Sequence, residues 1–91
     1  MTTSMTRLST EAQYLRAVVT WARIVGKRNG RVTAELVICL TILLTEDLTD
    51  DALQRIHGRL IYALTCTTDA QLVAALVDAA CDVMRMREVA A

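Results

Sequence analysis

The stretch Leu36-Val37-Ile38-Cys39-Leu40-Thr41-Ile42-Leu43-Leu44 decides how the rest of this chain can fold. Eight of its nine residues are apolar, with Thr41 as the exception. Because a helix turns by about 100° per residue, a helical run of this composition has no polar face of its own. We therefore expect a helix at the centre of the fold, covered by the other segments on nearly every side.

A membrane-spanning helix is the main alternative for such an apolar run. Crossing a bilayer takes about 20 apolar residues, whereas Glu35 precedes this run and Glu46 and Asp47 follow it closely. Residues 1–7 also lack the apolar segment of a secretory signal. We therefore expect a soluble, cytoplasmic protein that makes no membrane contact.

The composition favours a small all-α domain that associates with another chain. Of the 91 residues, 54% are hydrophobic, there is no proline, and only three are glycine. Good helix formers are abundant and helix breakers are scarce, which indicates helices throughout. A chain of this size buries only about 60–65% of its unfolded surface, so it has little interior for so many aliphatic side chains. We expect a homodimer or a complex with a different protein.

The N-terminal part has no clear periodicity until Thr10. Residues 1–8 are polar, and we expect a flexible arm there, ahead of a single helical domain at residues 9–91. Thr10 and Gln13 have the spacing of a capping box, which predicts the start of the first helix. The Asn-Gly pair that follows Arg28 tolerates the left-handed conformation that closes helices, so this helix should end there.

Three further threonines, Thr33, Thr49 and Thr68, have the surroundings of helix N-caps. They predict helices that run to about residues 45, 65 and 88. Together the helices predict a compact, four-helix bundle-like domain with the apolar second helix at its centre. The side chains predicted to face the core are Tyr14, Val18, Trp21 and Val25 in the first helix, with Leu15 and Ala22 beside them, Leu53, Ile56, Leu60 and Leu64 in the third, and Leu72, Val73, Leu76, Val77, Ala80, Val83 and Met84 in the last. Asp78, Asp82 and Arg85 of the last helix should face water.

No residue pattern indicates catalysis, a metal or a cofactor. His57 is the only histidine, and no cysteine or acid lies three or four residues from it. Cys39, Cys66 and Cys81 are odd in number and lack the close pair spacing of zinc sites, so we expect buried free thiols in a reducing compartment. We therefore predict that the protein is not an enzyme and holds no cofactor.

The charge balance argues against nucleic acid as the partner. Ten basic and ten acidic residues give a net charge of zero, whereas nucleic-acid binders usually have a positive excess. A helix-turn-helix made by the second and third helices is the alternative hypothesis, with Gln54, Arg55 and Arg59 offered to a groove. The acidic residues around Leu48 would then repel the phosphates. A local basic patch, at the end of the first helix, either stabilises the helix dipole or binds an anionic partner: Arg23, Lys27, Arg28 and Arg31.

Two further surfaces are candidates for protein contacts. Arg55, Arg59 and Tyr62 share one outer stripe of the third helix and belong to residue types that dominate interface energetics. Gly58 lies on this helix as well and costs about 1 kcal/mol relative to alanine, so we expect a close approach by a neighbour. Leu40 and Leu43 of the apolar run are the candidates for self-association. The sequence thus predicts a homodimeric, protein-binding adaptor, regulator or stoichiometric inhibitor.

Overall fold

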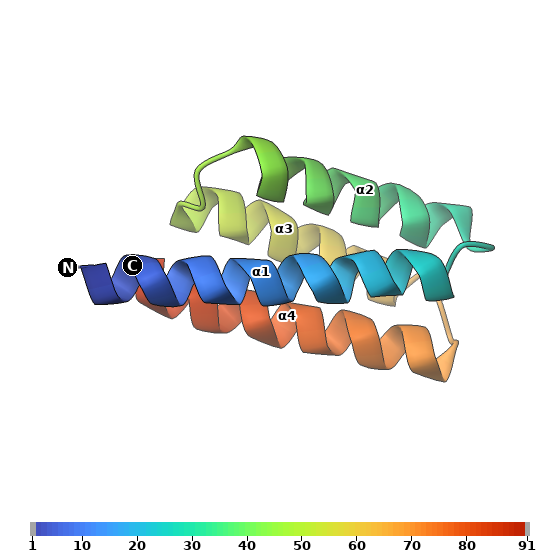
Figure 1. Ribbon diagram of the computed structural model, residues 1–91. Coiled ribbons are helices and arrows are strands. Elements are labelled where there is room, and N and C mark those ends of the chain that lie inside the picture. The colour runs from blue at the N-terminus through green and yellow to red at the C-terminus, as the bar shows by residue number, and fades with distance from the viewer. Residues whose placement is uncertain (1, 91) are drawn as a thin grey trace.

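The computed structural model describes the backbone of residues 2–90 and the side chains of residues 10–89. Within residues 2–90 it contains four helices and no strand: α1 (Thr2–Val25), α2 (Gly30–Thr45), α3 (Asp50–Leu64) and α4 (Ala70–Ala90). Successive helices run in opposite directions, so both ends of the chain lie at the same end of the bundle (Figure 1). The predicted all-α, four-helix bundle-like fold is confirmed.

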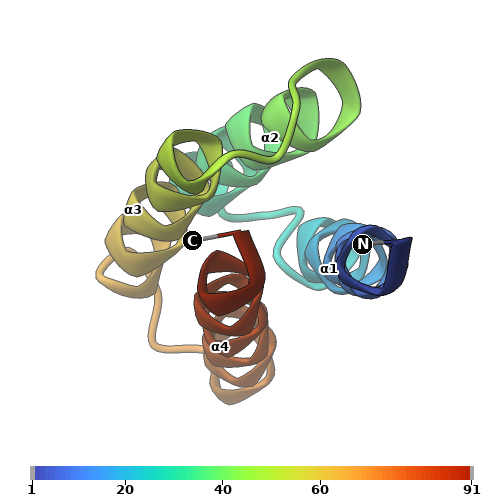
Figure 2. The same ribbon diagram turned by 90° about the vertical axis from the view of Figure 1, so that its left-hand side faces the viewer.

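The helices form a ring in which each one packs against two others. α1 contacts α2 and α4, and α3 contacts the same two helices, whereas α2 and α4 lie diagonally across the bundle (Figure 2). The expected central position of α2 is therefore wrong, because α2 is one of four walls. Its inner face includes Leu36 and Cys39, which are fully buried, while Val37 and Leu44 on its outer face are 42% and 64% exposed.

Helix α1 begins earlier than the capping box predicted. It starts at Thr2 and ends at Val25, so residues 2–8, expected as an arm, lie within the helix. The correction has a simple reason: no proline or glycine precedes Thr10, and a capping box favours a helix start without forbidding the turn before it. Met1 and the side chains of residues 2–9 lie outside the described part of the chain.

The start of α2 also differs from the prediction. Asn29, and not Thr33, is its N-cap: the backbone of Asn29 is extended and its Oδ1 accepts a hydrogen bond from the Val32 amide at 3.2 Å. Thr33 instead lies in the first turn and donates its hydroxyl to the Gly26 carbonyl. No residue in the described chain has the left-handed conformation that was expected after Arg28.

The caps of the last two helices follow the expected pattern more closely. Thr49 caps α3 by accepting from the Ala52 amide, as predicted. In α4 the capping side chain is Asp69, one residue beyond Thr68, and its Oδ1 accepts from the Leu72 amide at 2.9 Å. A carboxylate in this position also interacts favourably with the positive end of the helix dipole.

The interior is aliphatic, and α3 contributes to it as predicted, through Leu53, Ile56 and Leu60. The inward faces of α1 and α4 agree only in part with the prediction: Leu72, Leu76, Ala80 and Val83 of α4 are buried as predicted. The sequence predicted that four large side chains of these helices would be buried, but they are 45–49% exposed: Tyr14, Trp21, Val77 and Met84. Their places in the core are taken by Leu15, Val19 and Ala22 of α1 and by Ala79, Asp82 and Met86 of α4.

These rotations have a physical cause in the sequence itself. The set Leu15, Val19 and Ala22 has the same helical spacing as Tyr14, Val18 and Trp21 and differs from it by one residue. Such a helix has two adjacent apolar stripes, so periodicity alone does not say which stripe faces the core. The smaller aliphatic side chains fill the interior, and the aromatic ones lie at the surface.

Among residues 10–89, Asp82 is the one buried polar or charged residue. Its side chain is 0% exposed, and its Oδ1 accepts a hydrogen bond from Arg85 at 3.2 Å. As a carboxylate, its Oδ2 has no hydrogen-bond partner among the described residues. Glu11 of α1 also pairs with Arg85, at 3.6 Å. Burial raises the pKa of Asp82 to about 7, and the neighbouring Glu11 adds to this rise while Arg85 opposes it. A protonated Asp82 can donate to Glu11, which satisfies Oδ2.

The Asn29 side chain links the α1–α2 connection to the α3–α4 connection at one end of the bundle. Besides capping α2, its Nδ2 donates a hydrogen bond of 2.9 Å to the Cys66 carbonyl. We predict that Asn29→Ala lowers the free energy of unfolding by about 1–3 kcal/mol, because it removes both interactions. Urea unfolding followed by circular dichroism measures this loss.

The variant Asn29→Ser separates the two contributions of this side chain. Serine is also a good N-cap, but it is too short to reach the Cys66 carbonyl. We expect a smaller loss of stability for serine than for alanine. Equal losses in the two variants would show that the cap contributes nothing.

A second prediction concerns the pH dependence of stability. Above about pH 4 the unfolded chain ionises Asp82, while the folded chain keeps the proton until about pH 7, so wild-type stability should fall as pH rises through this range. Asp82→Asn cannot ionise. We expect it to be more stable than wild type at about pH 8, by at least about 1.4 kcal/mol, the equivalent of one pKa unit. At about pH 4 the two proteins should be similar.

The matched control is Asp47→Asn, because Asp47 is exposed and forms no ion pair with any side chain in residues 10–89. Its stability relative to wild type should stay constant between the two pH values. An Asp82→Asn difference that is equally constant would contradict a protonated, buried Asp82.

Candidate functional site

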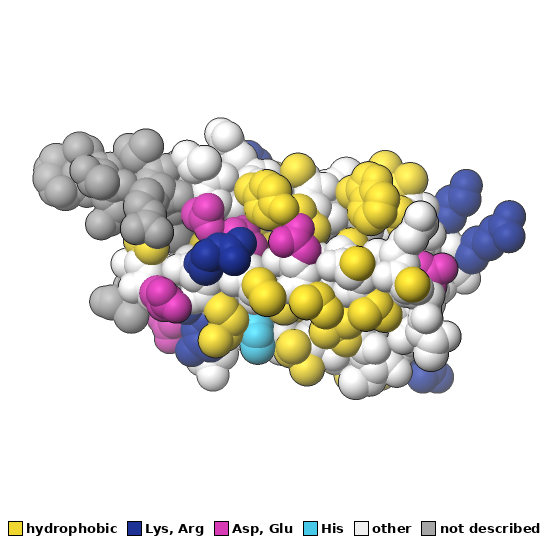
Figure 3. Space-filling view, turned by 90° about the horizontal axis from the view of Figure 1, so that it is seen from below, with side chains coloured by type: hydrophobic (Ala, Val, Ile, Leu, Met, Phe, Trp, Pro, Cys, Tyr) yellow, Lys and Arg dark blue, Asp and Glu magenta, His cyan; other side chains and the backbone are white. Residues whose placement is uncertain are grey.

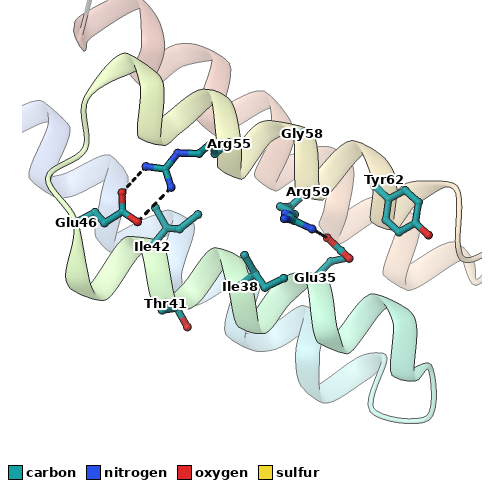
Figure 4. A pocket seen from close by; sticks show the side chains of 9 residues that line it. All are labelled: Glu35, Ile38, Thr41, Ile42, Glu46, Arg55, Gly58, Arg59 and Tyr62. Carbon is teal, nitrogen blue, oxygen red and sulfur yellow. Dashed lines mark hydrogen bonds and ion pairs between the residues drawn. The ribbon is translucent and has the colours of Figure 1, made fainter.

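A groove of about 760 Å³ runs along the outer side of α2 and α3 (Figure 4). The two helices are antiparallel neighbours, so residues early in α2 lie beside residues late in α3. The groove is lined by Glu35, Ile38, Thr41, Ile42 and Glu46 from α2 and by Arg55, Gly58, Arg59 and Tyr62 from α3. The structure therefore brings the predicted set Arg55, Arg59 and Tyr62 together on one wall of a concave surface.

Two ion pairs join the α2 and α3 walls of the groove. At one end both terminal nitrogens of the Arg55 guanidinium donate to the Glu46 carboxylate, and its Nε donates to Asp51 at 3.3 Å. Further along, Arg59 Nη1 donates to Glu35 Oε1 at 3.2 Å. These contacts place both guanidinium groups against the α2 wall. The hydrogen bond from Arg55 also lowers the pKa of Glu46, so this carboxylate remains ionised.

The floor of the groove is apolar and open between the two ion pairs. Ile38 and Ile42, one turn apart on α2, contribute the floor on one side. Gly58 lies opposite on α3, between Arg55 and Arg59 (Figure 4). A Cβ atom built on Gly58 would meet no atom within 4 Å apart from its chain neighbours and the nearby backbone of its own helix. Among the described residues, no close neighbour explains the glycine, whereas the sequence analysis expected one.

These residues offer recognition chemistry. Two guanidinium–carboxylate pairs, an apolar floor and the Thr41 and Tyr62 hydroxyls can contact a ligand. Arg59 is neutralised by Glu35, and Arg55 contacts two carboxylates, Glu46 and Asp51, so neither end of the groove has an excess of positive charge. An occupant therefore needs an apolar stripe more than a strong negative charge.

The α2 wall of this groove escaped the sequence analysis. Glu35, Ile38, Ile42 and Glu46 belong to, or flank, the run that was expected to be covered on every side. One pattern could have indicated them. In antiparallel neighbours, an acid early in the first helix faces a base late in the second, and Glu35 and Arg59 have this relationship.

The predicted basic patch lies at the end of the bundle where α1 leads into α2. Arg23, Lys27, Arg28 and Arg31 are all exposed, and none of them forms an ion pair within residues 10–89. Lys27 and Arg28 also border a small hollow of about 390 Å³ beside Asp69 and Leu72, at the start of α4. The patch and the groove are therefore separate surfaces.

The two leucines expected to mediate self-association do not form a free surface. Leu43 is only 9% exposed and belongs to the core, and Leu40 is partly buried and packs against it. This corrects the prediction, which assumed that the fourth side of a central α2 was left uncovered. The outer face of α2 presents Val37, Thr41 and Leu44 instead.

His57 and the cysteines are separate from the groove. His57 is half-buried on α3. Cys39 is buried, and burial raises the pKa of its thiol to about 12, whereas Cys66 is half-buried and Cys81 is exposed, contrary to the expectation of three buried thiols. Among the described residues, no three histidine, cysteine or acidic side chains are grouped so that they could hold a metal ion.

The helix pair α2–α3 does not have the geometry of a helix-turn-helix. That motif joins two helices at about 90–120°, whereas α2 and α3 run antiparallel along the bundle (Figure 1). Both arginines that were expected to enter a DNA groove are paired with carboxylates. In the part of the chain that the structure describes, no helix combines the length and the apolar character needed to cross a bilayer.

Comparison with known proteins gives no further guide to the site. The chain matches no protein-family model, no curated protein and no solved structure. The geometry and chemistry of its own residues are therefore what support a function.

Proposed function

We propose that this chain is a non-enzymatic, homodimeric protein-binding module of the cytoplasm, acting as an adaptor, regulator or stoichiometric inhibitor of another protein. Its partner binds in the groove between α2 and α3. The groove is concave, has an apolar floor, and has a rim of arginine and tyrosine side chains, which are residue types enriched at the energetic centres of protein interfaces. The presence of three free cysteines supports a reducing compartment.

Gly58 is the observation that carries this proposal. A glycine in a helix interior costs about 1 kcal/mol relative to alanine, and in α3 no neighbouring atom requires its small size. The space above Gly58 is the middle of the groove. A partner backbone that packs closely against this position accounts for the glycine, because any larger side chain at residue 58 would extend into the groove.

The shape of the groove favours an amphipathic helix as the bound segment. Ile38 and Ile42 form an apolar strip along the groove direction, which suits the apolar stripe of a helix laid into a groove. The Arg55–Glu46 and Arg59–Glu35 pairs flank this strip and can each offer one acceptor and one donor to polar residues of the partner. Tyr62, half exposed beyond Arg59, extends the contact at that end (Figure 4).

The ion pairs also prepare the surface for binding. Free arginine side chains lose rotamer freedom when they are fixed in an interface, at about 0.5–1.5 kcal/mol each. Arg55 and Arg59 are already positioned by Glu46 and Glu35, so less of this freedom remains to be lost. The same pairing leaves little free positive charge for phosphates, and this favours a protein partner over a nucleic acid.

Gly58→Leu tests the proposal with a side chain that fills the groove. The fold should tolerate it, because the position is open, and helix propensity predicts a gain in stability of about 0.5–1 kcal/mol. Proteins captured from native lysate by the wild-type chain should be lost with this variant. Mass spectrometry of the captured material, together with thermal unfolding of each variant, measures both effects.

Gln54→Leu is the matched control, since it adds the same side chain at an exposed position of α3 that does not line the groove. It should retain the captured partner. At the rim, Arg55→Ala, Arg59→Ala and Tyr62→Ala should each weaken capture while keeping the helical content. Equal capture by Gly58→Leu and by wild type would remove the groove from consideration.

A further inference from the structure

The outer side of α4 has a second apolar stripe, which is exposed among the residues that the structure describes. Five exposed residues recur at alternating spacings of four and three along the helix: Ala70, Ala74, Val77, Cys81 and Met84. Val77 and Met84 are 45% and 48% exposed. Seen from the α4 side, hydrophobic side chains gather along the middle of this face, with charged side chains beside them (Figure 3).

The neighbouring helices widen this zone. α4 packs between α1 and α3, and both present large apolar side chains at the surface. Tyr14 and Trp21 of α1 are 47% and 49% exposed, and Tyr14 donates a hydrogen bond to Asp78 of α4. Ile61 of α3 is 44% exposed. Large apolar patches of this kind on small proteins mark interaction sites.

This stripe is separate from the face of α4 that packs into the core. The opposite side of α4 is already filled, with Leu72, Leu76 and Val83 at most 2% exposed. Alternating spacings of four and three residues describe the seam of a two-helix coiled coil. The outer stripe of α4 therefore has the pattern of a helix that packs against one more helix.

We propose that this stripe binds the same stripe of a second copy, with the two α4 helices antiparallel. The two-fold axis crosses α4 at the level of Ala79. In this register Ala74 of each copy lies opposite Met84 of the other, and Val77 lies opposite Cys81. Each large side chain thus faces a small one, whereas a parallel arrangement in register would place Met84 against itself.

Charge complementarity also selects the antiparallel direction. Glu88 continues the stripe by one turn beyond Met84, is exposed, and forms no ion pair within residues 10–89. In the second copy it lies opposite Ala70, at the start of α4, where Lys27 and Arg28 border a hollow that Asp69 also lines. Two basic side chains beside one acidic side chain leave a net positive charge there. Two symmetric contacts between an acid and a basic pair therefore flank the apolar seam. A parallel dimer would place the two Glu88 side chains together.

This inference specifies the self-association in the proposed function and uses a surface separate from the groove. α2 lies diagonally across the bundle from α4, so the α2–α3 groove stays open in the dimer. Partner capture and dimer formation can therefore fail independently.

Sedimentation of the wild-type chain at micromolar concentration should give twice the mass of the 10.0 kDa chain. Val77→Asp should give the monomer mass with unchanged helical content, because Val77 is exposed in the single chain. Leu44→Asp, at a 64% exposed position on α2, is the matched control and should remain dimeric. A monomeric wild type, or a dimeric Val77→Asp variant, would overturn the proposal. Val77→Asp should still capture the groove partner.

Cysteine cross-linking tests the direction of the two helices. In a background with Cys66→Ser and Cys81→Ser, a mixture of Ala74→Cys and Met84→Cys chains should form a mixed disulfide on mild oxidation. Each chain alone should not, because in the antiparallel register neither position lies near its own symmetry copy. Disulfide formation by each variant alone, without the mixed product, would establish a parallel dimer and overturn the antiparallel arrangement.

Discussion

The structure depends on one packing constraint: a ring of four helices has a single interior, and each helix can turn only one face toward it. The chain has more aliphatic side chains than this interior holds. Among residues 10–89, nine large apolar side chains are at least 42% exposed, and they occur on all four helices. The placement of the surplus on the outside determines which surfaces are available for contacts with other molecules.

The orientation of α4 shows this constraint most clearly. The helix buries Asp82 and exposes Val77 and Met84, and both choices are unfavourable for an isolated chain. A proton on Asp82 and the neighbouring Glu11 and Arg85 reduce the first cost. The second cost is removed when the outer stripe is covered. The same orientation fills the interior with Leu72, Leu76, Val83 and Met86, which are at most 2% exposed. In a dimer through α4, this orientation of the helix would thus be favourable for its core-facing side and for its outer stripe.

The sequence predicted the fold class, the number of helices and the inward face of α3. It succeeded for α3 because Leu53, Ile56 and Leu60 form the only strong apolar stripe of that helix. It succeeded only in part for α1 and α4, where Tyr14, Trp21, Val77 and Met84 are exposed, because each helix has two apolar stripes. The choice between them depends on how four helices close around one core. The position of α2 was missed for a related reason: its hydrophobicity shows that it must be covered, but does not show whether its own chain or another one covers it.

Only the α3 wall of the candidate groove could be predicted from the sequence. Arg55, Arg59 and Tyr62 were visible as a polar and aromatic stripe on α3, but their opposite wall depends on which helix lies beside α3 and in which register. Gly58 was recognised as unfavourable for a helix, and the structure was needed to show that no internal neighbour explains it. The N-cap of α2 could not be predicted from the sequence for the same reason. Asn29 and Thr33 are both acceptable N-cap residues, and the hydrogen bond that Asn29 donates to the Cys66 carbonyl joins it to a segment distant in sequence.

The two proposed surfaces have different properties, and their relative positions have a functional consequence. The α4 stripe is apolar and continuous, which suits a permanent contact, whereas the groove combines an apolar floor with charged ends, which suits an exchangeable partner. Because α2 and α4 lie on opposite sides of the bundle, a dimer joined through α4 presents two grooves that face away from each other. Such a dimer would bind a bivalent or repetitive partner with an avidity that a single groove lacks, provided that the partner can span both sites. Two partner molecules could also be bridged by one dimer, and of the three roles proposed above this geometry fits an adaptor best.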